Sequence, residues 1–274
     1  MNYKEKYRQW LDFADPDTKA ELESLTDEKE IEDRFYKDLA FGTGGLRGIM
    51  GAGSNRMNRY TVGKATLGLA NYLKSTGKAD LKVAIAYDSR NNSADFAKTA
   101  AGIFANCGLH VYLYDRLVPV PVLSFTTRYL HCDAGVMITA SHNPKEYNGY
   151  KVYWQDGAQL PPHHAEAIAK KMEELDFFAS IKRMDYDEAV EKGLITVMGA
   201  ETDEKFLSNV MGQVNDKAAV EKVADTFKMV YTPFHGTGYK LIPEVLHRLG
   251  MKHVICVPEQ MVIDGNFPTV VSPN

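Results

Sequence analysis

A hydroxyl, an imidazole and two ammonium groups lie close together in the segment ITASHNPKEYNGYK, residues 138–151. Ser141 follows an apolar run and precedes Asn143-Pro144, a pair typical of a turn, so we expect its hydroxyl at the carboxyl end of a strand. The adjacent His142 could act as the base of a serine hydrolase. However, neighbouring side chains in an extended or turning chain rarely meet, and the GxSxG sequence of α/β hydrolases is missing. A reacting serine and an ordinary serine at a strand end both stay open, and a hydrolase is disfavoured.

Cationic side chains near glycines and strand ends could bind an anion. Arg47 lies in the glycine-rich stretch FGTGGLRGIMGAGSNRMN (41–58), Arg90 follows a short apolar run in YDSRNNS, and Lys145 and Lys151 flank an Asn-Gly pair typical of a turn. The arginine fork and exposed backbone N–H groups suit phosphate oxygens, although a single cation is more often a solvated surface charge. The glycine-rich stretch fits neither a Walker A loop nor a dinucleotide-binding fingerprint. Because these cations lie after strand ends or within a glycine-rich stretch, a phosphate site is an alternative to scattered surface charge.

Charge and composition exclude several kinds of ligand. The chain of 274 residues has a formal net charge of -4, so no positive field would gather nucleic acid or an anionic membrane. A small phosphorylated substrate stays possible if a local group of donors holds it. The 3 cysteines are far apart and lack CxxC spacing, which favours buried thiols in a reducing compartment over a disulfide framework or a zinc site. A charged N-terminus and the lack of an apolar run of roughly 20 residues predict a cytoplasmic protein without a membrane segment.

Strands and helices are predicted to alternate after a helical N-terminus. In residues 1–40, Asp15-Pro16 is typical of a helix start, and Ile31, Phe35 and Leu39 are spaced to share one helical face. Strands are predicted over 82–87, 109–114, 133–140 and 148–154, and helices over 60–73, 93–107, 161–175 and within 118–131. This order predicts three-layer α/β/α packing around a mainly parallel mixed sheet. Ligands of such sheets bind beyond the carboxyl ends of the strands, where both SRNNS and SHNP lie.

A second, incomplete domain is predicted after a polar connection over about 176–203. We assign residues 1–200 to the first domain with its N-terminal helices and 201–274 to part of a second. The second is expected to contain helices near 203–213 and 239–249 and strands over 227–233 and 252–257. Residues 103–115 and 245–258 share the order helix end, glycine, strand, which suggests that the second domain repeats the first. Since an α/β domain should not end after two strands, we expect a truncated chain. His235 in TPFHGTG is a weaker functional candidate, for which a turn role fits equally well.

Four segments together, TASHNPKEYNGYKVY, FGTGGLRGIMG, YDSRNNS and YTPFHGTG, resemble the α-D-phosphohexomutase superfamily of phosphoglucomutases, phosphomannomutases and phosphopentomutases. The first segment is the most specific, because its serine, histidine, Asn-Pro, Asn-Gly and lysine have the spacing of the family. The resemblance runs from about residue 40 to the end of the sequence. The helical N-terminus and the form FGTGGLRG are most similar to the branch holding bacterial phosphoglucomutases, phosphopentomutase-type phosphoglucomutases and glucose-1,6-bisphosphate synthase.

The resemblance implies roles for individual residues. Ser141 would be a phosphoserine that gives its phosphoryl group to one hydroxyl of a sugar monophosphate and recovers it from another. Lys151 would act as general acid and base near that hydroxyl, with His142 and Arg47 supporting the phosphoryl group. Phosphoryl transfer through a loose transition state needs positioning and positive charge, which agrees with these residue types. We also expect phosphate or substrate contacts at Thr43, Gly44, Arg90 and Asn143.

The resemblance also implies Mg²⁺, bound through the phosphate on Ser141 and three aspartates of a DGDGDR-like loop, and a sugar 1,6-bisphosphate that primes the serine. This sequence has no such loop, and Asp264-Gly265-Asn266 does not replace it. The GExSG and RxSGTEP-like loops of later family domains are also missing. We therefore expect the N-terminal portion of a sugar-phosphate mutase, inactive without the C-terminal domains of the same polypeptide. The alternative is a non-catalytic phosphosugar-binding or regulatory module.

Overall fold

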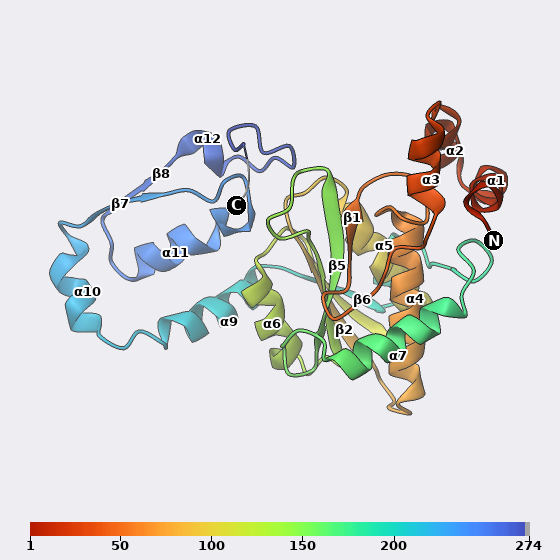
Figure 1. The fold of residues 1–274 in the computed structure, drawn as a ribbon. Coiled ribbons are helices and arrows are strands. Elements are labelled where there is room, and N and C mark those ends of the chain that lie inside the picture. Colours follow the sequence, from red (N-terminus) through yellow and green to blue (C-terminus); the bar gives the residue numbers. More distant parts are fainter. Residues whose placement is uncertain (272–274) are drawn as a thin grey trace.

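The computed structural model describes residues 1–271, in which three short helices precede a large α/β part and a smaller one (Figure 1). The N-terminal helices are α1 Tyr3–Phe13, α2 Pro16–Glu23 and α3 Glu28–Phe35. The large part contains β1 Leu46–Ile49, α4 Arg59–Ser75, β2 Lys82–Tyr87, α5 Ser93–Asn106, β3 His110–Tyr114, α6 Val120–Tyr129, β4 Ala134–Ile138, β5 Tyr147–Trp154, α7 Pro162–Glu173, α8 Tyr186–Glu191 and β6 Ile195–Met198. The smaller part contains α9 Ala200–Met211, α10 Lys217–Ala224, β7 Lys228–Tyr231, the 3-10 turn η1 Thr237–Tyr239, α11 Leu241–Arg248, β8 His253–Cys256 and α12 Pro258–Met261. None of these helices is long and apolar enough to cross a membrane.

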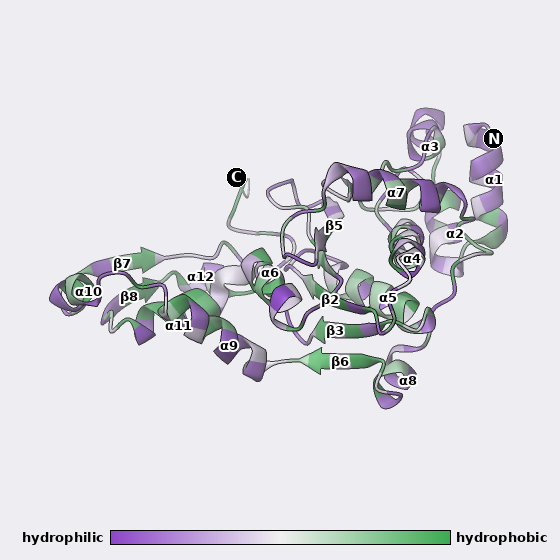
Figure 2. Ribbon diagram, turned by 90° about the horizontal axis from the view of Figure 1, so that it is seen from below, coloured by the Kyte–Doolittle hydropathy of each residue, from purple (hydrophilic) through white to green (hydrophobic). Residues whose placement is uncertain are grey.

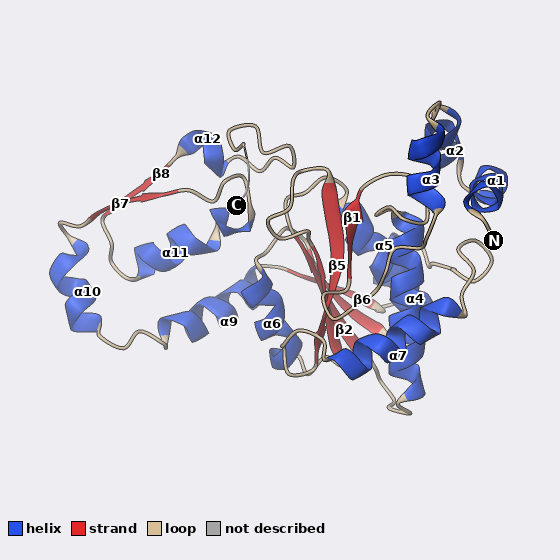
Figure 3. Ribbon diagram, in the orientation of Figure 1, coloured by secondary structure: helices blue, strands red, loops and turns tan. Residues whose placement is uncertain are grey.

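The large part is a six-stranded sheet between two layers of helices (Figure 3). The strand order is β1-β5-β4-β2-β3-β6, in which β4, β2, β3 and β6 are parallel and both pairs made by β5 are antiparallel. Side chains of β2 alternate between two cores: Val83 and Ile85 pack with α4, α5 and α7, whereas Ala84 and Ala86 pack with α6. The predicted three-layer α/β fold with a mainly parallel mixed sheet is confirmed.

The parallel strands point toward the smaller part of the molecule. Figure 2 shows the arrowheads of β3 and β6 on that side. Since β2 and β4 are parallel neighbours, the loops that follow them leave the sheet at the same edge. The smaller part is attached here through a shared core, in which Leu207 of α9 and Leu241 of α11 cluster with Val122 of α6.

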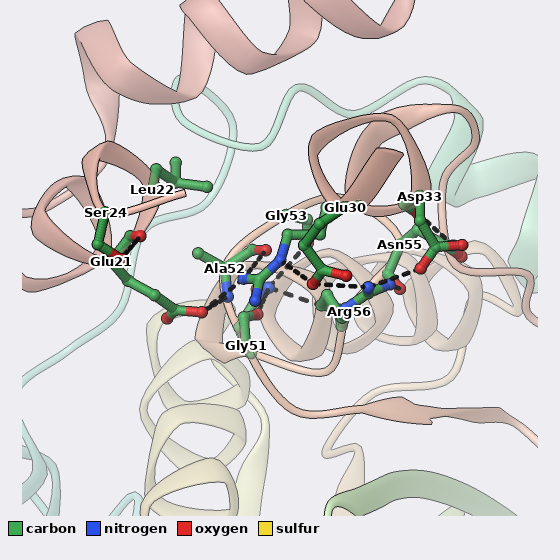
Figure 4. A network of polar contacts seen from close by, with 12 residues as sticks. Glu21, Leu22, Ser24, Glu30, Asp33, Gly51, Ala52, Gly53, Asn55 and Arg56 are labelled. Atoms are coloured by element: carbon green, nitrogen blue, oxygen red, sulfur yellow. Dashed lines mark hydrogen bonds and ion pairs between the residues drawn. The ribbon is translucent and has the colours of Figure 1, made fainter. Parts of the chain in front are cut away.

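An ion-pair network attaches the N-terminal helices to residues 50–58, the part of the glycine-rich stretch that follows β1 (Figure 4). Arg34 Nη1 donates to Glu21 Oε1 at 2.5 Å and to the Ala52 carbonyl at 3.0 Å, while the Ala52 N–H donates to the same carboxylate oxygen at 3.0 Å. Arg56 Nη2 lies 2.6 Å from Asp33 Oδ2. Because the side chains of Arg34 and Arg56 are only 13% and 6% exposed, these contacts fix α2 and α3 against residues 50–58.

The start of α2 follows the prediction, and the face of α3 does so only in part. The Asp15 carboxylate accepts the Thr18 N–H as the N-cap of α2, and Pro16 is its first residue. Ile31 and Phe35 are buried on α3. The helix ends at Phe35, so the prediction that Leu39 shares this helical face is wrong; Leu39 packs on the main core instead.

Two predictions from local sequence are overturned by strand pairing. The passage 176–203 is not a simple connection, because it contains α8 and the edge strand β6, which pairs with β3. The two central residues of β6, Thr196 and Val197, are both exposed, so the sequence lacks the alternation of buried and exposed residues that predicts a strand. Asn148-Gly149 is not a turn, since both residues lie inside β5 and pair with β1. In both cases the local sequence favours a loop or turn, and only pairing with a strand far along the chain makes the segment a strand.

The smaller part repeats a unit of the large one. Gly108 ends α5 and Gly250 ends α11, and both have a φ of 82°. In both places the next N–H, that of Leu109 or of Met251, donates to the carbonyl five residues earlier. Each helix then leads into a strand that is parallel to its neighbour, β3 with β2 and β8 with β7. The predicted repeat of helix end, glycine and strand is confirmed. The division into residues 1–200 and 201–274 stays a prediction, and residues 272–274 lie outside the described range.

Candidate functional site

Two loops meet at the carboxyl ends of β2 and β4. Residues 88–92 follow β2, and residues 139–146, called the serine loop below, follow β4. The Asp88 N–H donates to the Ile138 carbonyl at 3.1 Å, which joins the two loop starts. The prediction that YDSRNNS and ITASHNP share one edge of the sheet is confirmed.

Ser141 is exposed and has a left-handed backbone. Its φ is 60°, a region that costs a residue other than glycine of order 1–3 kcal/mol. Its N–H donates to Thr139 Oγ1 at 2.9 Å. His142 Nδ1 lies 3.4 Å from Ser141 Oγ, so the prediction that these neighbouring side chains stay apart is wrong. The contact is long, and within residues 1–271 no carboxylate is bonded to His142 to complete a hydrolase triad.

Arg90 holds the serine loop from behind. Its guanidinium donates to four carbonyls of the loop and its exit, those of Ser141 (3.1 Å), Asn143 (2.6 Å), Pro144 (2.8 Å) and Tyr147 (3.0 Å). Its Nε lies 3.4 Å from Asp88 Oδ2. Arg90 is only 4% exposed and both its Nη1 and Nη2 groups already donate to loop carbonyls, so its expected role as a phosphate ligand does not fit the structure. Its role here is to support the backbone that carries Ser141.

Arg47 and Lys151 lie on one face of the sheet beside the serine loop. In the register of β1 and β5, Arg47 pairs with Gly149, two residues from Lys151, while Leu46 and Tyr150 face the core on the other side. Burial is the main cause that lowers the pKa of Lys151, and the positive charge of Arg47 lowers it further. Arg47 is exposed. The arrangement therefore combines a fixed positive charge with an amine that loses its proton more readily than a surface lysine.

The remaining predicted ligands differ in how well they suit a phosphate. Thr43 and Gly44 are exposed at the tip of a tight turn closed by mutual hydrogen bonds of Gly42 and Gly45 at 2.8 and 3.1 Å. Asn143 directs its Oδ1 inward, where that oxygen is buried and has no hydrogen-bond partner within the described chain. Because Oδ1 can only accept, only the Nδ2 group of Asn143 is chemically suited to a phosphate oxygen.

Asp88 and Asn148 are supporting residues that the sequence reasoning missed. Asp88 Oδ1 accepts the Arg90 N–H at 3.0 Å and the Ser93 hydroxyl at 2.8 Å. Burial raises the pKa of Asp88, and hydrogen bonds from Thr139, Arg90 and Ser93 oppose this. Asn148 Nδ2 donates to the Asn91 carbonyl and to Ser93 Oγ, both at 3.0 Å, so β5 is tied to the loop after β2. The signal for Asp88 was its position directly after a buried strand; none marked Asn148, which looked like a turn residue.

Ser141, His142 and residues 144–146 of the serine loop are exposed. A cavity of about 640 Å³ lies elsewhere, between α2, the start of α4, α5 and residues 183–186. It contains none of the predicted site residues, and we assign it no part in the chemistry. The described residues contain no group of three His, Cys, Asp or Glu side chains that could hold a metal.

His235, the weaker candidate, is buried inside the smaller part. Its Nδ1 lies 2.7 Å from the Val262 carbonyl and its Nε2 lies 2.8 Å from Thr269 Oγ1. The ring therefore contacts the segment 262–269 through one backbone carbonyl and one side-chain hydroxyl, which is a structural role like the turn role considered for this residue.

Two family models match the sequence in the order of the two parts. The model for phosphoglucomutase/phosphomannomutase, alpha/beta/alpha domain I, matches residues 38–179, and that for domain II matches residues 204–274. A phosphoglucomutase of Staphylococcus haemolyticus is 38% identical over 265 residues, which is 97% of this chain and 47% of that protein. A phosphoglucomutase of Staphylococcus aureus is 34% identical over 273 residues, with the same coverage. This chain thus spans about half the length of the curated relatives it matches.

Solved structures show the same fold. A protein of Thermus thermophilus assigned as a phosphomannomutase superposes with a TM-score of 0.71 at 23% identity, covering 85% of this chain and 48% of that one. A phosphoglucomutase/phosphomannomutase family protein of Burkholderia thailandensis gives 0.62 at 19% identity, covering 83% and 45%.

Proposed function

This chain belongs to the phosphoglucomutase/phosphomannomutase family, and from this we propose that Ser141 carries a phosphoryl group in the interconversion of a sugar 1-phosphate and its 6-phosphate or 5-phosphate. The observation that carries the proposal is the placement of Ser141. Its side chain is exposed at the carboxyl end of β4, Lys151 lies on the adjacent strand β5, and Arg47 lies on β1, the strand beyond β5. The phosphate of a phosphoserine carries nearly two negative charges, so positive charge beside it is the main requirement.

Each residue has a defined part in the proposed transfer. The bond between Ser141 Oγ and phosphorus breaks as a hydroxyl oxygen of the sugar monophosphate bonds to the phosphorus. The hydroxyl proton passes to the Lys151 amine, whose lowered pKa provides a neutral fraction for this task. In the return step the other phosphate of the bisphosphate sugar moves to Ser141 Oγ, and Lys151 returns a proton to the released sugar oxygen. Arg47 stabilises the equatorial phosphoryl oxygens throughout.

Mg²⁺ and a sugar 1,6-bisphosphate primer belong to the proposal. A magnesium ion would bind a phosphate oxygen on Ser141 and lower the negative charge there. The described residues do not complete its coordination, because they lack a cluster of acidic side chains near Ser141. We therefore derive no step through the metal. The proposal places its remaining ligands, and the rest of the sugar site, in the half of the relatives that this chain does not cover.

A second candidate is a non-catalytic phosphosugar-binding or regulatory module, also in the cytoplasm. It would hold a phosphate with the same cations, Arg47 and Lys151, without transfer to Ser141. The two candidates differ in whether Ser141 becomes covalently modified.

The test is intact mass spectrometry of the chain after incubation with glucose 1,6-bisphosphate and Mg²⁺, with the site mapped by fragmentation. A single transfer to Ser141 is not the full catalytic cycle, for which the half of the relatives that this chain does not cover is expected to be needed. We therefore expect one phosphate on Ser141, none in Ser141→Ala, and normal modification in Ser75→Ala, which removes another exposed serine. A phosphorylated Ser141→Ala would refute the proposal. Binding of glucose 6-phosphate by calorimetry without any modification of the wild type would favour the module.

A further inference from the structure

A turn of the smaller part lies against the loop that supports Ser141. This turn, residues 264–267 with the sequence Asp-Gly-Asn-Phe, follows α12 of the smaller part (Figure 1). Asn91 Nδ2 donates to Asn266 Oδ1 at 3.1 Å. Gly265 approaches so closely that a Cβ there would lie 2.6 Å from the Asn91 nitrogen and 2.9 Å from the Ser89 oxygen. The turn therefore touches the backbone on both sides of Arg90.

Phe267 covers the guanidinium of Arg90. The Arg90 Cζ lies 5.5 Å from the centre of the Phe267 ring, within the range of a cation–π interaction. Both residues are buried, at 4% and 8% exposure. An aromatic ring in this place excludes water from the guanidinium, which strengthens its hydrogen bonds to the four carbonyls of the serine loop.

The turn is itself held in one conformation. Phe267 has a φ of 49°, which a phenylalanine adopts only when its surroundings impose it. His235 forms hydrogen bonds to Val262 before the turn and to Thr269 after it, so it fixes the two ends of this segment relative to each other. A buried histidine and a strained backbone thus keep this ring at Arg90.

We propose that Phe267 is a positioning residue for Ser141. His235 holds residues 262 and 269 on either side of Phe267, and the Phe267 ring contacts Arg90, so the smaller part sets the conformation of the serine loop. The placement of that part therefore controls how Ser141 is presented to a phosphoryl donor. The proposal rests on the proposed function for its catalytic consequence, whereas its structural consequence can be measured independently.

The first measurement is amide hydrogen exchange of residues 139–148 in the present chain, read by mass spectrometry. Phe267→Leu keeps an apolar side chain and removes the ring, and we expect the loop to exchange about fivefold faster, the usual worth of a cation–π contact. Phe267→Tyr should restore the wild-type rate. Asn266→Ala, at an exposed position, gives a smaller increase and keeps the test valid if the Phe267 variants fold poorly. Phe234→Leu, an exposed phenylalanine of the same part, is the control.

The second measurement is the rate at which glucose 1,6-bisphosphate phosphorylates Ser141 in the same variants. We expect Phe267→Leu to slow it about fivefold and Phe267→Tyr to restore it, in step with the exchange data. Unchanged exchange in Phe267→Leu, or an increase spread over the whole smaller part, overturns the proposal. A wild type that never gains phosphate refutes the proposed function instead, while the exchange data still decide whether Phe267 orders the loop.

Discussion

Asp15 offers a quantitative test of whether the N-terminal helices are docked as described, because residues 1–37 precede the segment matched by the domain I model. Burial alone would raise the pKa of Asp15. Hydrogen bonds from the Thr18 hydroxyl, the Tyr60 hydroxyl and the Thr18 N–H, together with the charge of Arg59, outweigh burial and lower the pKa from 3.8 to about 2. Since Tyr60 and Arg59 belong to α4, much of this effect exists only when the helices contact the large part.

The folded state therefore favours ionised Asp15 by about 2 kcal/mol, at about 1.4 kcal/mol per pH unit between 3.8 and about 2. Because the folded pKa is the lower one, this stabilisation is complete well above pH 3.8 and is lost as the pH falls toward 2. We expect Asp15→Asn to reduce the free energy of unfolding by about 2 kcal/mol at pH 7, and the gap to the wild type to narrow by about 1 kcal/mol at pH 3.

Urea unfolding of the wild type and of Asp15→Asn between pH 7 and pH 3 measures the difference between their free energies of unfolding. Asp17→Asn is the matched control, an exposed aspartate in the first turn of the same helix, for which we expect less than about 0.5 kcal/mol. Equal stabilities of Asp15→Asn and wild type at pH 7, or parallel pH curves, would show that Asp15 does not tie α2 to α4 in solution.

Three further predictions concern the sheet and the site. Gly149→Ala should lower the free energy of unfolding in urea by about 3 kcal/mol, because its Cβ would lie 2.5 Å from the Thr139 oxygen and 2.9 Å from the Leu46 oxygen. Gly212→Ala, with no contact under 3.3 Å, should lower it far less, and similar losses in the two variants would contradict the strand packing. Gly108→Ala and Gly250→Ala should each cost about 1–2 kcal/mol and by similar amounts, since both have a φ of 82° and open space around the added methyl; a large difference would argue against the structural repeat. Competitive labelling with acetic anhydride across pH should show Lys151 reacting at lower pH than the average lysine. Arg47→Gln should return the pKa of Lys151 only part of the way to that of the average lysine, because burial is the larger cause of the lowered pKa. Titration of Lys151 together with the average lysine would refute this.

The elements that the sequence predicted are those whose signals are local. β2 was expected over 82–87 and is found there, because a short β-branched run buried on both faces needs no knowledge of its neighbours. The left-handed glycines that end α5 and α11 are equally local. β1 and β6 were missed for the opposite reason: one lies among glycines and the other alternates poorly, so only pairing with β5 and β3 makes them strands.

The site divides in the same way. The position of Ser141 followed from an apolar run and a turn pair, whereas the role of Arg90 could not, because an arginine that binds phosphate and one that binds backbone carbonyls look alike in sequence. What separates them is burial, a property of the assembled loops. Phe267 was invisible for the same reason, since its partner Arg90 is far away along the chain.

The register of β4 and β5 explains why serine and lysine must keep their spacing. The serine loop joins these antiparallel strands, in which Ile138 pairs with Tyr150 and Met137 with Lys151. Along β5, Tyr150 faces the core and Lys151 faces Arg47, so a shift of one residue would exchange the two. Tyr150 is completely buried and its hydroxyl bonds to Thr66 at 3.2 Å, which opposes such a shift. The core residue beside the lysine thus determines on which face the amine lies, and the length of the serine loop is constrained by packing as well as by chemistry.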